Sequence, residues 1–172
     1  MIISECGLSN AESYLEIGYS ADNHTQSRVL SPLSDHVDEI VTGKVQTGDA
    51  YIFQQNITAV DFIKIDTEGH EMAVLQGFGR TLSEAKIKVI QFEYGTTWIA
   101  PKKFLHEVYA LLEPPGYQIG RLYPDGVFFK SYNRLEDDHF RMGNYVAVHN
   151  KYAPIITSLN LNPSARIRKF RH

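Results

Sequence analysis

The sequence predicts an α/β fold built around a parallel strand, helix, strand unit. Two apolar strand-like runs, residues 61–65 and 86–92, flank a segment in which Met72, Leu75 and Phe78 recur at helical spacing. Another helical pattern and then further strands follow. Because the connecting helix returns the chain to the same end of the sheet, the crossover rule makes the two runs parallel neighbours.

The first part of the chain predicts short strands and a long loop. Apolar residues at 2–3 and 14–17 indicate a strand followed by a partly exposed hairpin. Residues 18–49 are rich in Ser, Asp, Asn, Thr and Gly, and they predict a loop that contains one short strand at 39–45. A loop of this length inside a compact domain is typically functional or mobile.

The second half predicts one helix and three strands. A helical pattern over residues 101–112 ends at Glu-Pro-Pro-Gly, which stops a helix. Residues 117–132 predict two strands joined by a Pro-Asp-Gly turn, and residues 143–150 predict a further strand. No convincing period follows from about residue 151 onward.

Composition favours a single domain with a core of ordinary size. The chain has 172 residues, of which 43% are hydrophobic and 12% aromatic. We predict a domain over residues 1–150 and a basic tail over residues 151–172. The tail ends in RIRKFRH, which could contact an acidic partner, although a solvated tail is the favoured interpretation.

Charge and cysteine content exclude several classes of protein. A net charge of -3 provides no global basic field, so we expect no nucleic-acid partner. The single cysteine, Cys6, cannot form an internal disulfide, which favours a reducing compartment and a cytoplasmic location. We expect no signal peptide and no membrane span, because there is no basic leader and no run of about 18 apolar residues.

Polar residues gather where the two parallel strands end. Asp66 and Glu68 follow the first strand, and Glu93 lies at the end of the second. Ligands of open parallel sheets bind beyond the C-terminal strand ends, so we expect these carboxyls at one crevice. Gly69 permits a tight turn there, and His70, with an ordinary pKa of about 6.5, could remove a proton from a hydroxyl.

The same loop also has a purely structural interpretation. Asp66 or Thr67 would then only cap the following helix, and His70 would be a surface residue. The local sequence alone favours this interpretation. A metal site is a weaker alternative, because Val74 stands where a zinc-protease helix carries its second histidine. We therefore expect no metal.

These segments resemble a known family. DFIKIDTEGHEMAVLQGF at residues 61–78, followed by KVIQFEY, is similar to the FkbM family of S-adenosylmethionine-dependent methyltransferases, which share (I/V)DF(I/L)KID(V/T)EG(H/A)E. The upstream segments VQTGDAY and ECGLSNAESYLEI also resemble the family, which extends the similarity to residues 4–149. The matching core positions are Lys64, Asp66, Glu68, Gly69, Glu71, Leu75, Gly77 and Glu93.

The resemblance implies transfer of a methyl group from S-adenosyl-L-methionine to a hydroxyl of a sugar, polyketide or other small-molecule acceptor. Asp66 and Glu68 are then expected near the methyl-transfer centre, with Asp66 also contacting the cofactor. His70 is the candidate general base. Glu93 and Lys64 are expected to contact the substrate or support the site, and a buried ion pair that fixes the strand end is an equal alternative for Lys64.

The resemblance further implies a Rossmann-like sheet, mostly parallel with an antiparallel C-terminal strand. The family's glycine-rich cofactor turn has no counterpart in this sequence, so we expect a partial, N-terminally incomplete domain. Its partner would be a missing N-terminal half or a companion chain. The strand at 61–65 should then have an unpaired edge and an uncovered apolar face. The alternatives are a non-catalytic α/β remnant that serves as a binding or assembly module and, more weakly, a metal-dependent hydrolase.

Overall fold

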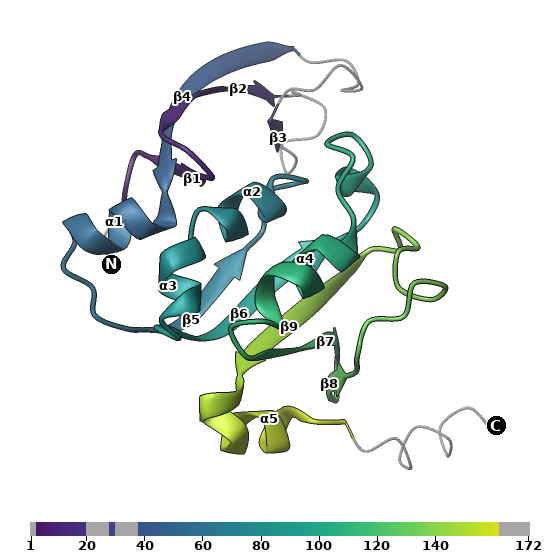
Figure 1. The fold of residues 1–172 in the computed structure, drawn as a ribbon. Helices are drawn as coiled ribbons and strands as arrows, with labels where there is room; N and C mark the ends of the chain where they lie inside the picture. The colour runs from purple at the N-terminus through teal and green to yellow at the C-terminus, as the bar shows by residue number, and fades with distance from the viewer. Residues whose placement is uncertain (1–2, 20–27, 30–37, 162–172) are drawn as a thin grey trace.

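A computed structural model describes residues 3–19, 28–29 and 38–161, which form a mixed α/β fold with two sheets (Figure 1). The elements, in chain order, are β1 (Gly7–Ser9), β2 (Ser13–Tyr19), β3 (Arg28–Val29), β4 (Glu39–Thr47), α1 (Gly48–Gln54), β5 (Val60–Ile65), α2 (Glu71–Gln76), α3 (Gly79–Ser83), β6 (Ile87–Tyr94), η1 (Thr96–Trp98), α4 (Leu105–Leu112), β7 (Tyr117–Tyr123), β8 (Gly126–Phe129), β9 (Gly143–His149), η2 (Asn150–Tyr152) and α5 (Ala153–Leu159).

The smaller sheet has the strand order β1-β4-β2-β3. β1 pairs with β4 in parallel, and β2 pairs with β4 antiparallel over its whole length. The short strand predicted at residues 39–45 is therefore confirmed as part of β4. The strand predicted at residues 2–3 is not confirmed, because residue 2 lies outside the described residues and Ile3 is not in a strand.

The larger sheet has the order β5-β6-β9-β7-β8. The predicted parallel pairing of β5 with β6 is confirmed, from Val60 opposite Ile87 to Ile65 opposite Phe92. The expected antiparallel C-terminal strand is confirmed, because β9 runs antiparallel to both β6 and β7. The sheet is nevertheless mixed rather than mostly parallel, because β7 and β8 also pair antiparallel. The reason lies in the connections: a tight turn joins β7 to β8, and β9 then inserts between β6 and β7 in the opposite direction.

One face of the larger sheet is covered by α2, α3 and α4 (Figure 1). Ile90, Phe92 and Tyr94 alternate along β6 and enter the core with the apolar side chains of these helices. Each buried side chain of this size stabilises the fold by about 1.5–3 kcal/mol. The helix predicted around Met72 to Phe78 is two short helices instead, and a Cβ on Gly77, between them, would lie 2.1 Å from the Ser9 carbonyl oxygen.

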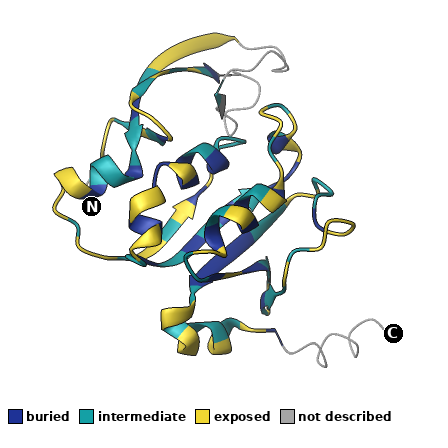
Figure 2. Cartoon of the chain, in the orientation of Figure 1, coloured by how far each residue is buried: buried dark blue, intermediate teal, exposed yellow. Residues whose placement is uncertain are grey.

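Among the described residues, α5 covers the opposite face at one end only. Side chains of α5, including Ile155 and Leu159, pack on Val146 and Val148 of β9. β5, which is partly exposed in Figure 2, lies at the other end, and its outer edge pairs with no described strand. Phe62 is 53% exposed. The described residues thus leave the edge of β5 unpaired, as expected, and they leave Phe62 uncovered on its outer face.

The predicted basic tail begins with η2 and α5, so its first part is helical. Residues 162–172 lie outside the described residues, and the boundary of the tail stays a prediction. Across the described ranges, no helix is both long enough and apolar enough to cross a membrane.

Candidate active site

Three carboxylates meet where β5 and β6 end. Asp66, Glu68 and Glu93 each place a carboxylate oxygen within 4.8 Å of the others. These three side chains, which we expected at one crevice, therefore do lie close together. Burial raises the pKa of Glu93, and the negative charges of Asp66 and Glu68 raise it further. Glu93 thus holds a proton more strongly than an exposed glutamate.

Lys64 neutralises part of this negative charge. Its Nζ lies 2.6 Å from Oδ2 of Asp66, and this hydrogen bond raises the pKa of Lys64. The two side chains are 54% and 42% exposed. The pair is therefore solvated, and the alternative of a buried ion pair that fixes the strand end is not what the structure shows.

A buried carboxylate shapes the loop that carries these residues. Glu71 is fully buried and accepts hydrogen bonds from the backbone N–H groups of Thr67 and Gly69, at 2.8 and 3.0 Å. Burial raises the pKa of Glu71, while these hydrogen bonds oppose the shift. The sequence marked Glu71 only as a matching position and did not reveal that it is the anchor of the loop.

The loop is also held tightly against the segment after β6. Gly69 has a φ of +105°, and a Cβ on it would lie 2.5 Å from the carbonyl oxygen of Thr97. Glu68 itself adopts a positive φ of 52°. Only glycine can occupy position 69 without strain or displacement of the neighbouring segment. The turn therefore fixes the direction in which Glu68 leaves the backbone.

His70 faces a different neighbour. Its Nε2 lies 2.9 Å from Oγ of Ser9, a buried residue at the end of β1. Burial lowers the pKa of His70, so the imidazole is neutral at pH 7. A neutral imidazole is the form that a general base requires, but His70 is outside the group formed by the three carboxylates.

A cavity of about 250 Å³ opens beside the free edge of β5. Its lining residues are Leu8, Ile63, Lys64, Ile65, Asp66, Thr67 and Val74. Oγ1 of Thr67 is buried and lies beside the carboxylate of Glu71. Ligand pockets usually measure about 300–1,000 Å³, so this cavity is smaller than a typical ligand pocket.

The three carboxylates are also the residues that could hold a divalent cation, since such ions prefer oxygen ligands. The expectation of no metal stays a prediction. The aromatic residues near the end of β6 have a clearer role: Phe92, Tyr94 and Trp98 are all fully buried. They are packing residues, and Nε1 of Trp98 donates to the carbonyl oxygen of Glu93 at 3.1 Å.

Comparison with known families agrees with this geometry. The model of the Methyltransferase FkbM domain matches residues 3–119, a span that includes β5, β6 and the loop of the three carboxylates. This match supports methyltransferase activity at the level of the family. This chain belongs to the FkbM methyltransferase domain family. No curated protein and no solved structure matches it.

Proposed function

We propose that this chain is the C-terminal part of the catalytic domain of an S-adenosyl-L-methionine-dependent O-methyltransferase. The acceptor is a hydroxyl of a sugar, polyketide or other small molecule. The observation that carries the proposal is the convergence of Asp66, Glu68 and Glu93 beyond the ends of two parallel strands, within the segment that matches the family. A Rossmann-like arrangement is proposed for the completed sheet.

The residues around the cavity fit one side of the cofactor. When bound, S-adenosyl-L-methionine supplies a methyl group on a sulfonium, which is open to in-line displacement. Asp66 and Thr67 line the cavity and would hold the cofactor's polar groups. Glu68 lies beside them and would orient the acceptor.

Two groups of the chain can receive the acceptor's proton. Glu93 belongs to the carboxylate cluster, and its raised pKa brings it closer to working pH. His70 is neutral and can act as a base if it exchanges its contact with Ser9 for the acceptor. Lys64 screens the cluster through Asp66, so that an acceptor hydroxyl can approach it.

The free edge of β5 supports a second component. An exposed strand edge beside an exposed Phe62 is a surface that an added parallel strand would cover. We propose that a further N-terminal segment or a companion chain supplies this strand and the glycine-rich cofactor turn. A cytoplasmic location is proposed from the single cysteine alone.

The test is methyl transfer from cofactor carrying a tritiated methyl group, with a small-molecule extract as the source of acceptors and with the companion added. Asp66→Asn should lower transfer roughly a hundredfold, and Asp61→Asn on the same strand should leave it near the wild-type rate. A labelled product that is stable to mild base supports a methyl ether, because a methyl ester would be hydrolysed. Transfer unaffected by Asp66→Asn would rule out the assigned role.

The second candidate is a non-catalytic α/β module that binds or assembles through β5. The open edge of β5 also favours this candidate, because an edge strand can bind a partner without any reaction at the carboxylates. The two candidates differ in one result: the module binds its partner and never binds S-adenosyl-L-methionine.

A further inference from the structure

A second cavity, of about 180 Å³, lies on the α4 side of the larger sheet. β7, β8, β9, α4 and the segment that leads into β9 all contribute to it. Its lining includes Tyr109, Arg121, Lys130, Asp137, His139 and Tyr145. None of these residues belongs to the carboxylate site, and the cavity is at the same end of the sheet, because β7 runs parallel to β6 through its antiparallel pairing with β9.

Two hydrogen-bond donors face each other in this cavity. The backbone N–H of Arg141 donates to Nδ1 of His139 at 2.9 Å, which leaves the proton of a neutral imidazole on Nε2. Nη1 of Arg121 lies 3.4 Å from Nε2, and this atom is also a donor. An acceptor atom with negative charge would satisfy both groups.

His139 is neutral at pH 7. Burial lowers its pKa, and the positive charges of Arg121 and Arg141 lower it further. An imidazolium would place a third positive charge in the same corner. The Nε2–H group is therefore a neutral donor beside a permanent cation.

Arg121 has no carboxylate partner among the described residues, whereas Lys130 in the same cavity pairs with both Glu136 and Asp137. Nη2 of Arg121 donates to the carbonyl oxygen of Met142 at 2.9 Å. The guanidinium lies against Gly143, where a Cβ would meet Nη2 at 2.8 Å. The backbone thus holds the cation in place without neutralising it.

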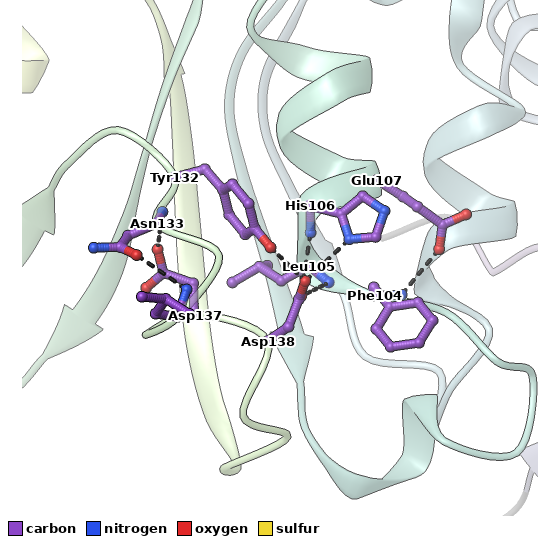
Figure 3. A network of polar contacts seen from close by, with 9 residues as sticks. Phe104, Leu105, His106, Glu107, Tyr132, Asn133, Asp137 and Asp138 are labelled. Atoms are coloured by element: carbon purple, nitrogen blue, oxygen red, sulfur yellow. Dashed lines mark hydrogen bonds and ion pairs between the residues drawn. The ribbon is translucent and has the colours of Figure 1, made fainter.

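The segment that carries His139 is anchored to α4 (Figure 3). Asp138 accepts the N–H of Leu105 at 2.7 Å and the hydroxyl of Tyr132 at 2.5 Å, and it contacts Nδ1 of His106 at 3.0 Å. These contacts hold the segment that carries His139 in place before any ligand arrives. A donor that is preorganised in this way binds an anion with little loss of conformational entropy.

The cavity and the carboxylate site lie on opposite faces of the larger sheet. Arg121 pairs with Tyr145, which pairs with Phe92, and the rings of Tyr145 and Phe92 belong to the core beneath α4. Successive residues of a strand point to opposite faces, so Glu93, which follows Phe92, faces away from the cavity. The cavity is therefore a separate site.

We propose that this cavity is a second binding site, separate from the methyl-transfer site, which holds the carboxylate group of an acidic sugar or related hydroxy acid through Arg121 and Nε2–H of His139. The inference goes beyond the proposed methyltransferase function and does not depend on it. A singly charged group is favoured over a phosphate dianion, because Glu136 and Asp137 also line the cavity. The volume equals that of about six water molecules, which suits one hydroxylated ring.

The test is calorimetric titration of the full chain with D-glucuronate and with D-glucose, its uncharged match, without cofactor. Glucuronate should bind roughly tenfold more tightly. Arg121→Gln should abolish this preference, and Arg134→Gln, an exposed arginine of the same segment, should retain it. Equal affinity for the two sugars, or an unchanged preference in Arg121→Gln, would overturn the proposal.

A measurement on the unmutated chain guards against misfolding of the variant. NMR titration of His139 should show a higher imidazole pKa with glucuronate than with glucose, because a carboxylate favours the charged ring. An unchanged pKa would count against the site. Glucuronate binding without methyl transfer contradicts the proposed function alone, and methyl transfer without glucuronate binding contradicts this inference alone.

Discussion

Glu71 determines the conformation of the active-site loop although it is not one of the three converging carboxylates. Its side chain is fully buried and satisfies the N–H groups of Thr67 and Gly69. A buried carboxylate is costly unless it is hydrogen-bonded in this way. The motif position therefore has a physical explanation: Glu71 closes the turn that aims Glu68.

Replacing Glu71 by glutamine places an NH2 group where only acceptors fit. We expect Glu71→Gln to lower the free energy of unfolding by about 1–3 kcal/mol. Urea denaturation followed by circular dichroism measures this change. Glu113→Gln, at an exposed position after α4, is the matched control and should change stability by less than about 0.5 kcal/mol. Equal effects of the two variants would contradict the anchoring role.

Two glycines, Gly69 and Gly79, allow a second test of the tight turn. Gly69 combines a positive φ with a close backbone neighbour, whereas a Cβ on Gly79 has open space around it. Gly69→Ala should destabilise the fold by more than about 1 kcal/mol. Gly79→Ala, in a helix, should stabilise it by about 0.4–1 kcal/mol. Thermal unfolding distinguishes the two, and a tolerated Gly69→Ala would disprove the tight turn.

The raised pKa of Glu93 makes stability depend on pH. Between its ordinary value of 4.5 and its higher folded value, the folded state binds more protons than the unfolded state. The contribution of Glu93 to the free energy of unfolding therefore falls as pH rises through this window. Asp66→Asn removes one repelling charge, so it should lower the pKa of Glu93, as followed by NMR of the labelled carboxyl carbon. No change of that pKa would mean that the two groups do not interact.

At the scale of elements, the β5 edge has the most direct consequence. Strand edges that expose apolar side chains promote association. Phe62→Lys should raise the concentration at which the chain self-associates by roughly tenfold, with little loss of stability, since Phe62 is half-exposed. Light scattering over a concentration series measures this. Phe53→Lys, on α1 and 80% exposed, is the control, and an equal shift in both variants would remove the special role of the edge.

The sequence was informative where local periodicity is strong. The β5–α2–β6 unit, the β7–β8 hairpin and β9 were all predictable, because each has apolar residues at its characteristic spacing. The break between α2 and α3 was not predictable, since it depends on the close approach of Gly77 to Ser9, which is distant in sequence. The strand order was equally hidden, because hydrophobic pattern does not specify which strand β9 joins.

In the candidate site too, some contacts could be predicted from the sequence and others could not. Asp66, Glu68 and Glu93 could be placed together because they follow parallel strands. The contact between His70 and Ser9 could not, because β1 belongs to the other sheet. The contact between Arg121 and His139 could not be predicted either, because it depends on the path of the chain between β8 and β9, which no local motif indicates.

At the scale of the whole molecule, the larger sheet is well packed on one face and open at β5. The helices α2 to α4 bury the first face, α5 covers only the far end of the second, and the carboxylate site lies at the open end. An enzyme that held its cofactor here would need a further wall beyond β5. The open edge of β5 and the cavity of about 250 Å³ therefore lie at the same place in the molecule.

The most direct test of this account is calorimetric titration of S-adenosyl-L-methionine into the chain, alone and together with the companion segment that completes β5. We expect binding that is stronger with the companion present, that is lost in Asp66→Asn and that is retained in Asp61→Asn. Absence of binding both with and without the companion would contradict the claim that this chain forms half of a methyltransferase site.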